Sequence, residues 1–82
     1  MVFDQIDYRN ILRLTFGMRQ KRNARYSLRA FARDLQVSPS RLSEVINGGH
    51  KLSPGTARDV AKKLGLSDSE QNYFSDLVES EA

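Results

Sequence analysis

Residues 27–49 read SLRAFARDLQVSPSRLSEVINGG, and this stretch decides the fold. Its first apolar residues follow the i, i+3, i+4, i+7 spacing of one helix face: Leu28, Phe31, Ala32 and Leu35. Ser27 precedes them as an N-cap. A second helix starts at Ser38-Pro39, because proline lacks an amide hydrogen and already has the φ of a first helical position. It ends at Asn47-Gly48-Gly49, where a glycine supplies a left-handed residue. Two short helices with so short a turn predict a helix-turn-helix.

Helix signals on both sides of this stretch predict three further helices. Asp7 caps the first, and Gly17 weakens it enough to allow a kink or a break. Ser53-Pro54 starts the fourth, and the capping box from Ser67 to Glu70 starts the fifth. The residues expected to face inward on these helices are Tyr8, Ile11, Leu12 and Phe16, then Ala57, Val60, Ala61 and Leu64, then Tyr73, Phe74, Leu77 and Val78. No stretch alternates as a strand would, so we expect an all-α, five-helix domain.

Charge is distributed unevenly along the 82 residues. The net charge of +3 combines +6 over residues 19–33, where no acid occurs, with −5 over residues 65–82, where no base occurs. A basic segment suits phosphate and an acidic one avoids it. The alternative is that the arginines between 19 and 33 only solvate two helix faces.

Composition excludes several classes of site. There is no cysteine, which rules out disulfides and thiolate metal sites and fits a reducing cytosol. The single histidine, His50, cannot form a zinc site alone. No apolar run is long enough for a membrane span, and no phosphate-cradling loop or nucleophile-base pair can be assembled. We therefore expect a cytoplasmic protein that is not an enzyme and needs no cofactor.

The third helix has a polar outward face. With Leu42, Val45 and Ile46 facing inward, rotation by ~100° per residue turns Ser40, Glu44 and Asn47 outward. Ser43 and Arg41 fall on the flanks. Short polar side chains bordered by a cation are what base-edge contact in a DNA groove requires.

These residues carry a family resemblance. The segment from Ser27 through "RAFARDL" and "LSEVINGGHKLSP" resembles the five-helix, lambda repressor-like domain of the Cro/C1 (Xre-like) helix-turn-helix family, with residues 27–64 as its core. Together with "DYR" at 7–9 and "AKKLGLSDSEQNYFSDLVE", it is similar to the N-terminal segment of larger bacterial proteins that continue into a C-terminal region of unknown role. The chain is then one domain over residues 1–82 and a candidate N-terminal fragment. Gln36 stands where the family commonly has glycine.

The resemblance implies a bacterial transcription regulator that binds double-stranded DNA as a homodimer, with helix 38–47 in the major groove. It implies base contacts from Ser40, Arg41 and Glu44, in which Glu44 accepts from cytosine and Arg41 donates to guanine or to phosphate. The implied phosphate contacts are Arg22, Arg25, Ser27, Ser38, Ser43, Asn47 and Lys51.

Several of these residues have a structural alternative. Ser38 is a helix cap whatever the function, and Asn47 is a helix terminator. Glu44 repels phosphates and can instead pair with Arg41 or Arg33. His50 reads as a solvated loop residue. The apolar residues of the fifth helix fit a core or a dimer seam equally well.

A second hypothesis from a different class stays open. The chain can be a protein-interaction module that keeps the helix-turn-helix shape without using it on DNA. The acid on the outward face of the third helix and the acidic fifth helix motivate this alternative.

Overall fold

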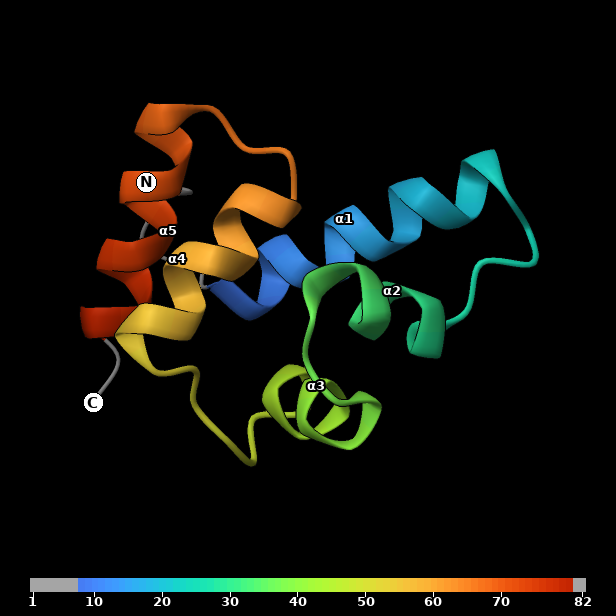
Figure 1. Ribbon diagram of the computed structural model, residues 1–82, viewed down its shortest axis with the longest axis horizontal. Coiled ribbons are helices and arrows are strands. Elements are labelled where there is room, and N and C mark those ends of the chain that lie inside the picture. The colour runs from blue at the N-terminus through green and yellow to red at the C-terminus, as the bar shows by residue number, and fades with distance from the viewer. Residues whose placement is uncertain (1–7, 81–82) are drawn as a thin grey trace.

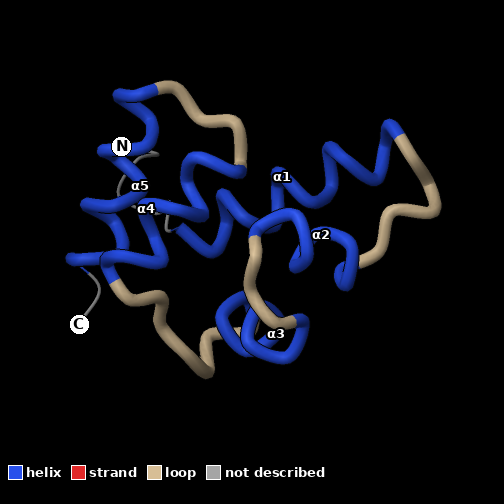
Figure 2. The backbone as a smooth tube through the Cα atoms, viewed as in Figure 1, coloured by secondary structure: helices blue, strands red, loops and turns tan. Residues whose placement is uncertain are grey.

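A computed structural model describes residues 8–80, and within them the five expected helices form in order (Figures 1 and 2). They are α1 (Tyr8–Arg22), α2 (Leu28–Leu35), α3 (Pro39–Ile46), α4 (Pro54–Lys63) and α5 (Asp68–Ser80). The residues between the helices are turns and loops, and no strand occurs in the described part of the chain. The predicted cap at Asp7 lies outside the described residues.

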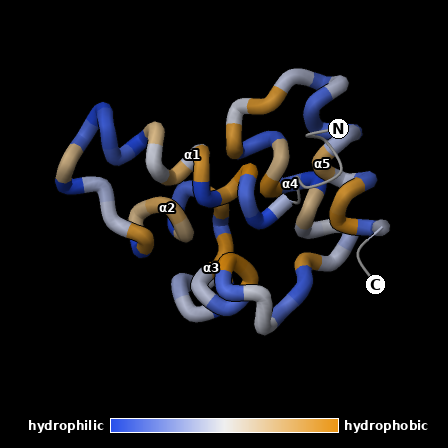
Figure 3. The backbone as a smooth tube through the Cα atoms, turned by 180° about the vertical axis from the view of Figure 1, so that it is seen from behind, coloured by the Kyte–Doolittle hydropathy of each residue, from blue (hydrophilic) through white to orange (hydrophobic). Residues whose placement is uncertain are grey.

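The helices pack in two pairs with α1 between them. α5 lies along α4, and α2 packs on α3, while α1 contacts both α3 and α5 (Figure 1). The basic loop between α1 and α2 lies at the opposite end of the molecule from α5, and hydrophilic residues dominate it (Figure 3). Arg25 in this loop is therefore far from α5, whereas Arg19 and Arg22 near the end of α1 line one groove with Glu70 of α5.

The core contains most of the residues that helical spacing selected. The side chains with 0% exposure are Tyr8, Leu12, Phe31, Ala32, Val45, Ala57, Ala61 and Phe74. The small side chain of Ala32 lets α2 approach its neighbours closely, and Val37 in the turn packs against the core. Aromatic rings add specific contacts, including an edge-on pair between Tyr8 and Phe74 with ring centroids 5.9 Å apart.

Serine caps start the helices where they were predicted. The hydroxyl of Ser27 accepts a hydrogen bond from the Ala30 amide at 3.1 Å, and Ser53 does the same for α4. At α5 the capping box is reciprocal: the Ser67 amide donates to Glu70 Oε1 at 2.8 Å, and the Glu70 amide donates to the Ser67 hydroxyl. The hydrogen bond that the Ser67 amide donates to the carboxylate holds the pKa of Glu70 below its ordinary value of 4.5.

Two expectations differ from the structure. α1 continues through Gly17 without a break as far as Arg22, because one glycine costs a helix only about 1 kcal/mol and packing along α1 offsets it. The prediction that Tyr73 faces inward is wrong, since 41% of its surface is exposed. α5 buries Phe74 and Val78 at its centre, so Tyr73, one residue earlier, is rotated to the side of the helix.

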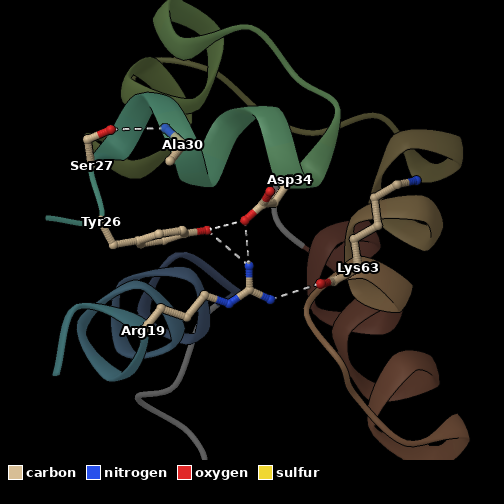
Figure 4. A network of polar contacts seen from close by, with 6 residues as sticks. All are labelled: Arg19, Tyr26, Ser27, Ala30, Asp34 and Lys63. Atoms are coloured by element: carbon tan, nitrogen blue, oxygen red, sulfur yellow. Dashed lines mark hydrogen bonds and ion pairs between the residues drawn. The ribbon is translucent and has the colours of Figure 1, made fainter. Parts of the chain in front are cut away.

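A polar network joins α1, α2 and α4 (Figure 4). Arg19 donates to the Tyr26 hydroxyl at 3.2 Å and to the Lys63 carbonyl at 2.9 Å, and its guanidinium lies 3.6 Å from Asp34. The Tyr26 hydroxyl donates to Asp34 at 2.6 Å. Burial and this bond raise the pKa of Tyr26 above its ordinary value of 10.0. Arg19 therefore stabilises the fold instead of only solvating a helix face.

Candidate nucleic-acid interface

Helix α3 presents the polar face that its sequence predicts. Leu42 and Val45 are buried at 2% and 0% exposure. Four of the five side chains expected to point outward or to flank this face are exposed: Ser40, Arg41, Glu44 and Asn47. Ser43 is half-buried, as a residue between the two faces should be. We call these four exposed residues the α3 face.

Local sequence fixes both ends of α3. At its start, the Ser38 hydroxyl accepts from the Arg41 amide at 3.1 Å, and Pro39 occupies the first turn. At its end, the Gly48 amide donates to the Val45 carbonyl and the Gly49 amide to the Glu44 carbonyl, at 3.1 and 2.8 Å. This pair of bonds is a Schellman motif, in which Gly48 has φ +87°.

Two arginines of α1 bind the C-terminal end of α3. Arg9 Nε donates to the Val45 carbonyl at 2.7 Å, and Arg9 Nη2 donates to the His50 carbonyl at 3.1 Å. Arg13 donates to the carbonyl of Ile46. The last carbonyls of a helix lack intrahelical partners, and cations there also complement the helix dipole. The orientation of α3 is therefore held by side chains from a helix about 35 residues earlier in the chain.

The turn between α2 and α3 closes with Gln36 in the left-handed conformation, at φ 60° and ψ 38°. The Gln36 amide donates to the Arg33 carbonyl and the Val37 amide to the Ala32 carbonyl, at 3.1 and 3.0 Å. These bonds form the same Schellman motif that ends α3. The tight turn thus forms despite the missing glycine, at the cost of a strained backbone at one residue.

A hollow of about 300 Å³ brings three of the predicted site residues together at the start of α3. Its lining includes Ser38, Arg41 and Lys51, with Ser53 from the start of α4. His50 also lines it, and Arg41 Nη1 lies 2.7 Å from His50 Nε2. An arginine has only donors, so this bond requires the neutral ring with its proton on Nδ1. His50 was expected to be a solvated loop residue, but it is half-buried and bonded to a member of the α3 face.

The alternative for Glu44, a surface ion pair, does not form among the described residues. Among residues 8–80, Glu44 forms no ion pair with Arg41 or Arg33, although its side chain is exposed. The carboxylate therefore remains available on the α3 face as an acceptor.

The remaining predicted phosphate contacts lie away from this hollow. Arg25 is exposed in the loop between α1 and α2, and Ser27 is the exposed cap of α2. Arg22, at the end of α1, lines a separate groove with Met18 and Glu70. The described residues thus gather Ser38, Arg41 and Lys51 in one place and leave Arg22 in another.

The sequence analysis missed the roles of Arg9, Arg13 and His50. Arg9 and Arg13 are spaced i, i+4 and therefore share one face of α1. No acid lies four residues from either arginine in the described helix, and this pattern indicates partners outside α1. Nothing in the sequence pairs His50 with Arg41 across nine residues. No group of three histidine or acidic side chains within residues 8–80 is placed to hold a metal ion, and no helix there is long and apolar enough to cross a bilayer.

Comparison with known proteins identifies the family. A family model described as helix-turn-helix matches residues 18–71, which span α2, α3 and α4 and part of α1 and α5. Searches of curated proteins and of solved structures returned no significant match. Since the match covers well over half of the chain and includes the α3 face, the chain belongs to the Cro/C1-type helix-turn-helix family, a family of DNA-binding regulators.

Proposed function

We propose that this protein is a transcription regulator that binds double-stranded DNA sequence-specifically, with α3 in the major groove. The observation that carries the proposal is the α3 face: four exposed polar side chains on a helix whose opposite side is buried and whose two ends are fixed. A groove-binding helix needs a rigid support so that its side chains meet base edges in one register.

Each residue of the α3 face has a distinct role in this proposal. Ser40 bonds to a base edge, Glu44 accepts from cytosine N4, and Arg41 donates to guanine or to a neighbouring phosphate. Asn47, at the end of the helix, contacts a phosphate. The absence of an ion partner for Glu44 among the described residues supports its assignment, because a paired carboxylate would have to exchange partners before binding.

Phosphate contacts come from both sides of α3. Ser38 and Lys51 line the hollow at its start, Ser43 lies on its flank, and Ser27 caps the neighbouring helix. Arg22 at the end of α1 and Arg25 in the α1–α2 loop supply further cations. Exposed amides at helix starts favour the same anions. A regulator of this kind acts in the cytoplasm, on the nucleoid.

The test is binding to a pool of random duplexes, followed by fluorescence anisotropy, over a range of salt concentrations. Each neutralised phosphate contributes about 0.9 to the slope of log affinity against log salt. Arg25→Ala and Lys51→Ala should each reduce that slope by about this amount. Lys62→Ala is the matched control, because Lys62 is an exposed cation near the end of α4 and away from the α3 face, and it should leave the slope unchanged.

Two results would overturn the proposal. One is the lack of any duplex binding at low salt. The other is binding that stays the same when Arg22, Arg25 and Lys51 are all replaced by alanine. A protein partner that covers the α3 face, with an affinity that ignores salt, would instead identify the chain as a protein-interaction module that retains the helix-turn-helix shape.

A further inference from the structure

His50 is held in place on both sides, although it lies in the loop that follows α3. Its carbonyl accepts a hydrogen bond from Arg9 Nη2 of α1 at 3.1 Å. Just before it, the Gly49 amide donates to the carbonyl of Glu44 at 2.8 Å. Two residues after it, Leu52 enters the core at 7% exposure. The loop therefore has fixed contacts before, at and after His50, and these contacts give the half-buried ring a defined position beside α3.

The ring of His50 accepts a hydrogen bond from Arg41. His50 Nε2 lies 2.7 Å from Arg41 Nη1, and the rest of the Arg41 side chain is exposed on the flank of α3. An arginine side chain has N–H donors and no acceptor, so Nε2 must be the acceptor. A long exposed side chain otherwise samples many rotamers. This bond selects one rotamer of Arg41 and leaves the other donors of the guanidinium for a ligand.

The bond keeps the guanidinium at the hollow that lies at the start of α3. Two cations line this hollow, Arg41 and Lys51, and no acid does so among the described residues. The hydroxyl-bearing side chains of Ser38 and Ser53 line it as well. Cations and hydroxyl groups are the side chains that contact phosphate oxygens in protein–DNA complexes. The position in which His50 holds Arg41 therefore favours a phosphate.

We propose that His50 is a positioning residue that holds Arg41 for contact with a DNA phosphate. This inference rests on the proposed function, which leaves both guanine and phosphate open as partners of Arg41, and it decides for the phosphate. A bidentate contact with guanine would need the guanidinium to turn toward the side of α3 where Ser40 and Glu44 lie, and the bond to His50 opposes this turn. An arginine that is already held in its bound rotamer loses less conformational entropy on binding.

The first test measures affinity by fluorescence anisotropy for two duplexes, one selected from the random pool and one unselected. Arg41→Ala should weaken binding to both by the same factor, because every duplex carries the phosphate. His50→Ala should weaken binding to both by about twofold to tenfold. His50→Gln should recover most of that loss, because the amide oxygen can replace Nε2 as the acceptor. Lys62→Ala, an exposed position on α4, is the matched control and should bind like the wild type.

A double-mutant cycle separates positioning from a general structural effect. If His50 acts through Arg41, His50→Ala should have no further effect on affinity in a protein that already carries Arg41→Ala. An equal effect of His50→Ala with and without Arg41 would overturn the proposal. The same holds for an Arg41→Ala variant that weakens binding to the selected duplex alone, because Arg41 would then contact a base.

A spectroscopic measurement without DNA tests the bond itself. The sequence contains one histidine, so the nitrogen NMR signals of an imidazole ring are assigned without ambiguity. Above the pH range in which histidine ordinarily titrates, we expect the proton on Nδ1, and we expect Arg41→Ala to lose this preference. A proton on Nε2 in the wild type would overturn the inference whatever the protein binds. A wild-type protein that binds no duplex would overturn the proposed function and this inference together, whereas duplex binding that does not respond to His50→Ala overturns this inference alone.

Discussion

Replacement of Gln36 by glycine should stabilise this protein, although it removes a side chain. Gln36 lies in the left-handed region at φ 60°, where a residue with a Cβ atom loses about 1–2 kcal/mol. Glycine avoids that strain but loses about 0.5–1 kcal/mol more in backbone entropy on folding. The Gln36 side chain is exposed and forms no hydrogen bond with another described residue, so its removal costs little. The net gain is about 0.5–1 kcal/mol.

Thermal unfolding followed by circular dichroism measures this gain. At about 4–8 °C per kcal/mol for a domain of this size, the melting temperature should rise by about 2–8 °C. Gln36→Ala separates backbone strain from side-chain loss, because alanine keeps the strain and should leave the melting temperature nearly unchanged. Gly65→Ala is the reverse control: its φ is +81° and nothing lies within 4 Å of an added Cβ, so strain alone should lower stability. A melting temperature that falls in Gln36→Gly would refute the strain argument.

Three further changes test the side-chain bonds that hold the helices together. Arg9→Ala should lower the free energy of unfolding in urea by about 2 kcal/mol, because it removes charge-assisted bonds to the Val45 carbonyl of α3 and the His50 carbonyl of the following loop; an unchanged midpoint would contradict this. Tyr26→Phe should cost about 1 kcal/mol through the lost bond to Asp34. Because the folded pKa of Tyr26 is raised, this contribution is complete below pH 10.0 and disappears as the pH rises through the folded pKa, so the two proteins should converge in alkaline melts. The lowered pKa of Glu70 has the opposite sign: its stabilising contribution is present above pH 4.5 and is lost as the pH falls through the folded pKa, so Glu70→Gln should destabilise at neutral pH and match the wild type in acid.

Short-range patterns in this sequence predict most of the fold. Ser27, Ser38 and Ser53 predict their helix starts because a cap depends only on residues two or three positions later. The exposed face of α3 is predictable because Leu42 and Val45 fix the rotation of the helix. The base contacts that the resemblance implies for Ser40, Arg41 and Glu44 stay a prediction.

The parts that the sequence did not predict depend on contacts between distant segments. The bonds from Arg9 and Arg13 to α3 join residues 36 and 33 positions apart. The exposure of Tyr73 depends on how α5 rotates when Phe74 enters the core beside Tyr8. A periodicity argument selects an apolar face about 100° wide or more, and packing decides which residues at its margin stay exposed.

The central claim is that the α3 face distinguishes one base sequence from another. The most direct measurement is selection of binding sites from random duplexes with the wild-type protein, repeated with Ser40→Ala and Glu44→Gln, and with Lys62→Ala as the control. We expect the wild type to select a defined site, and each α3 variant to change the preferred base at one position while the control selects the original site. Identical selected sites for the wild type and both α3 variants would contradict the account, because the α3 face would then make no contact that depends on sequence.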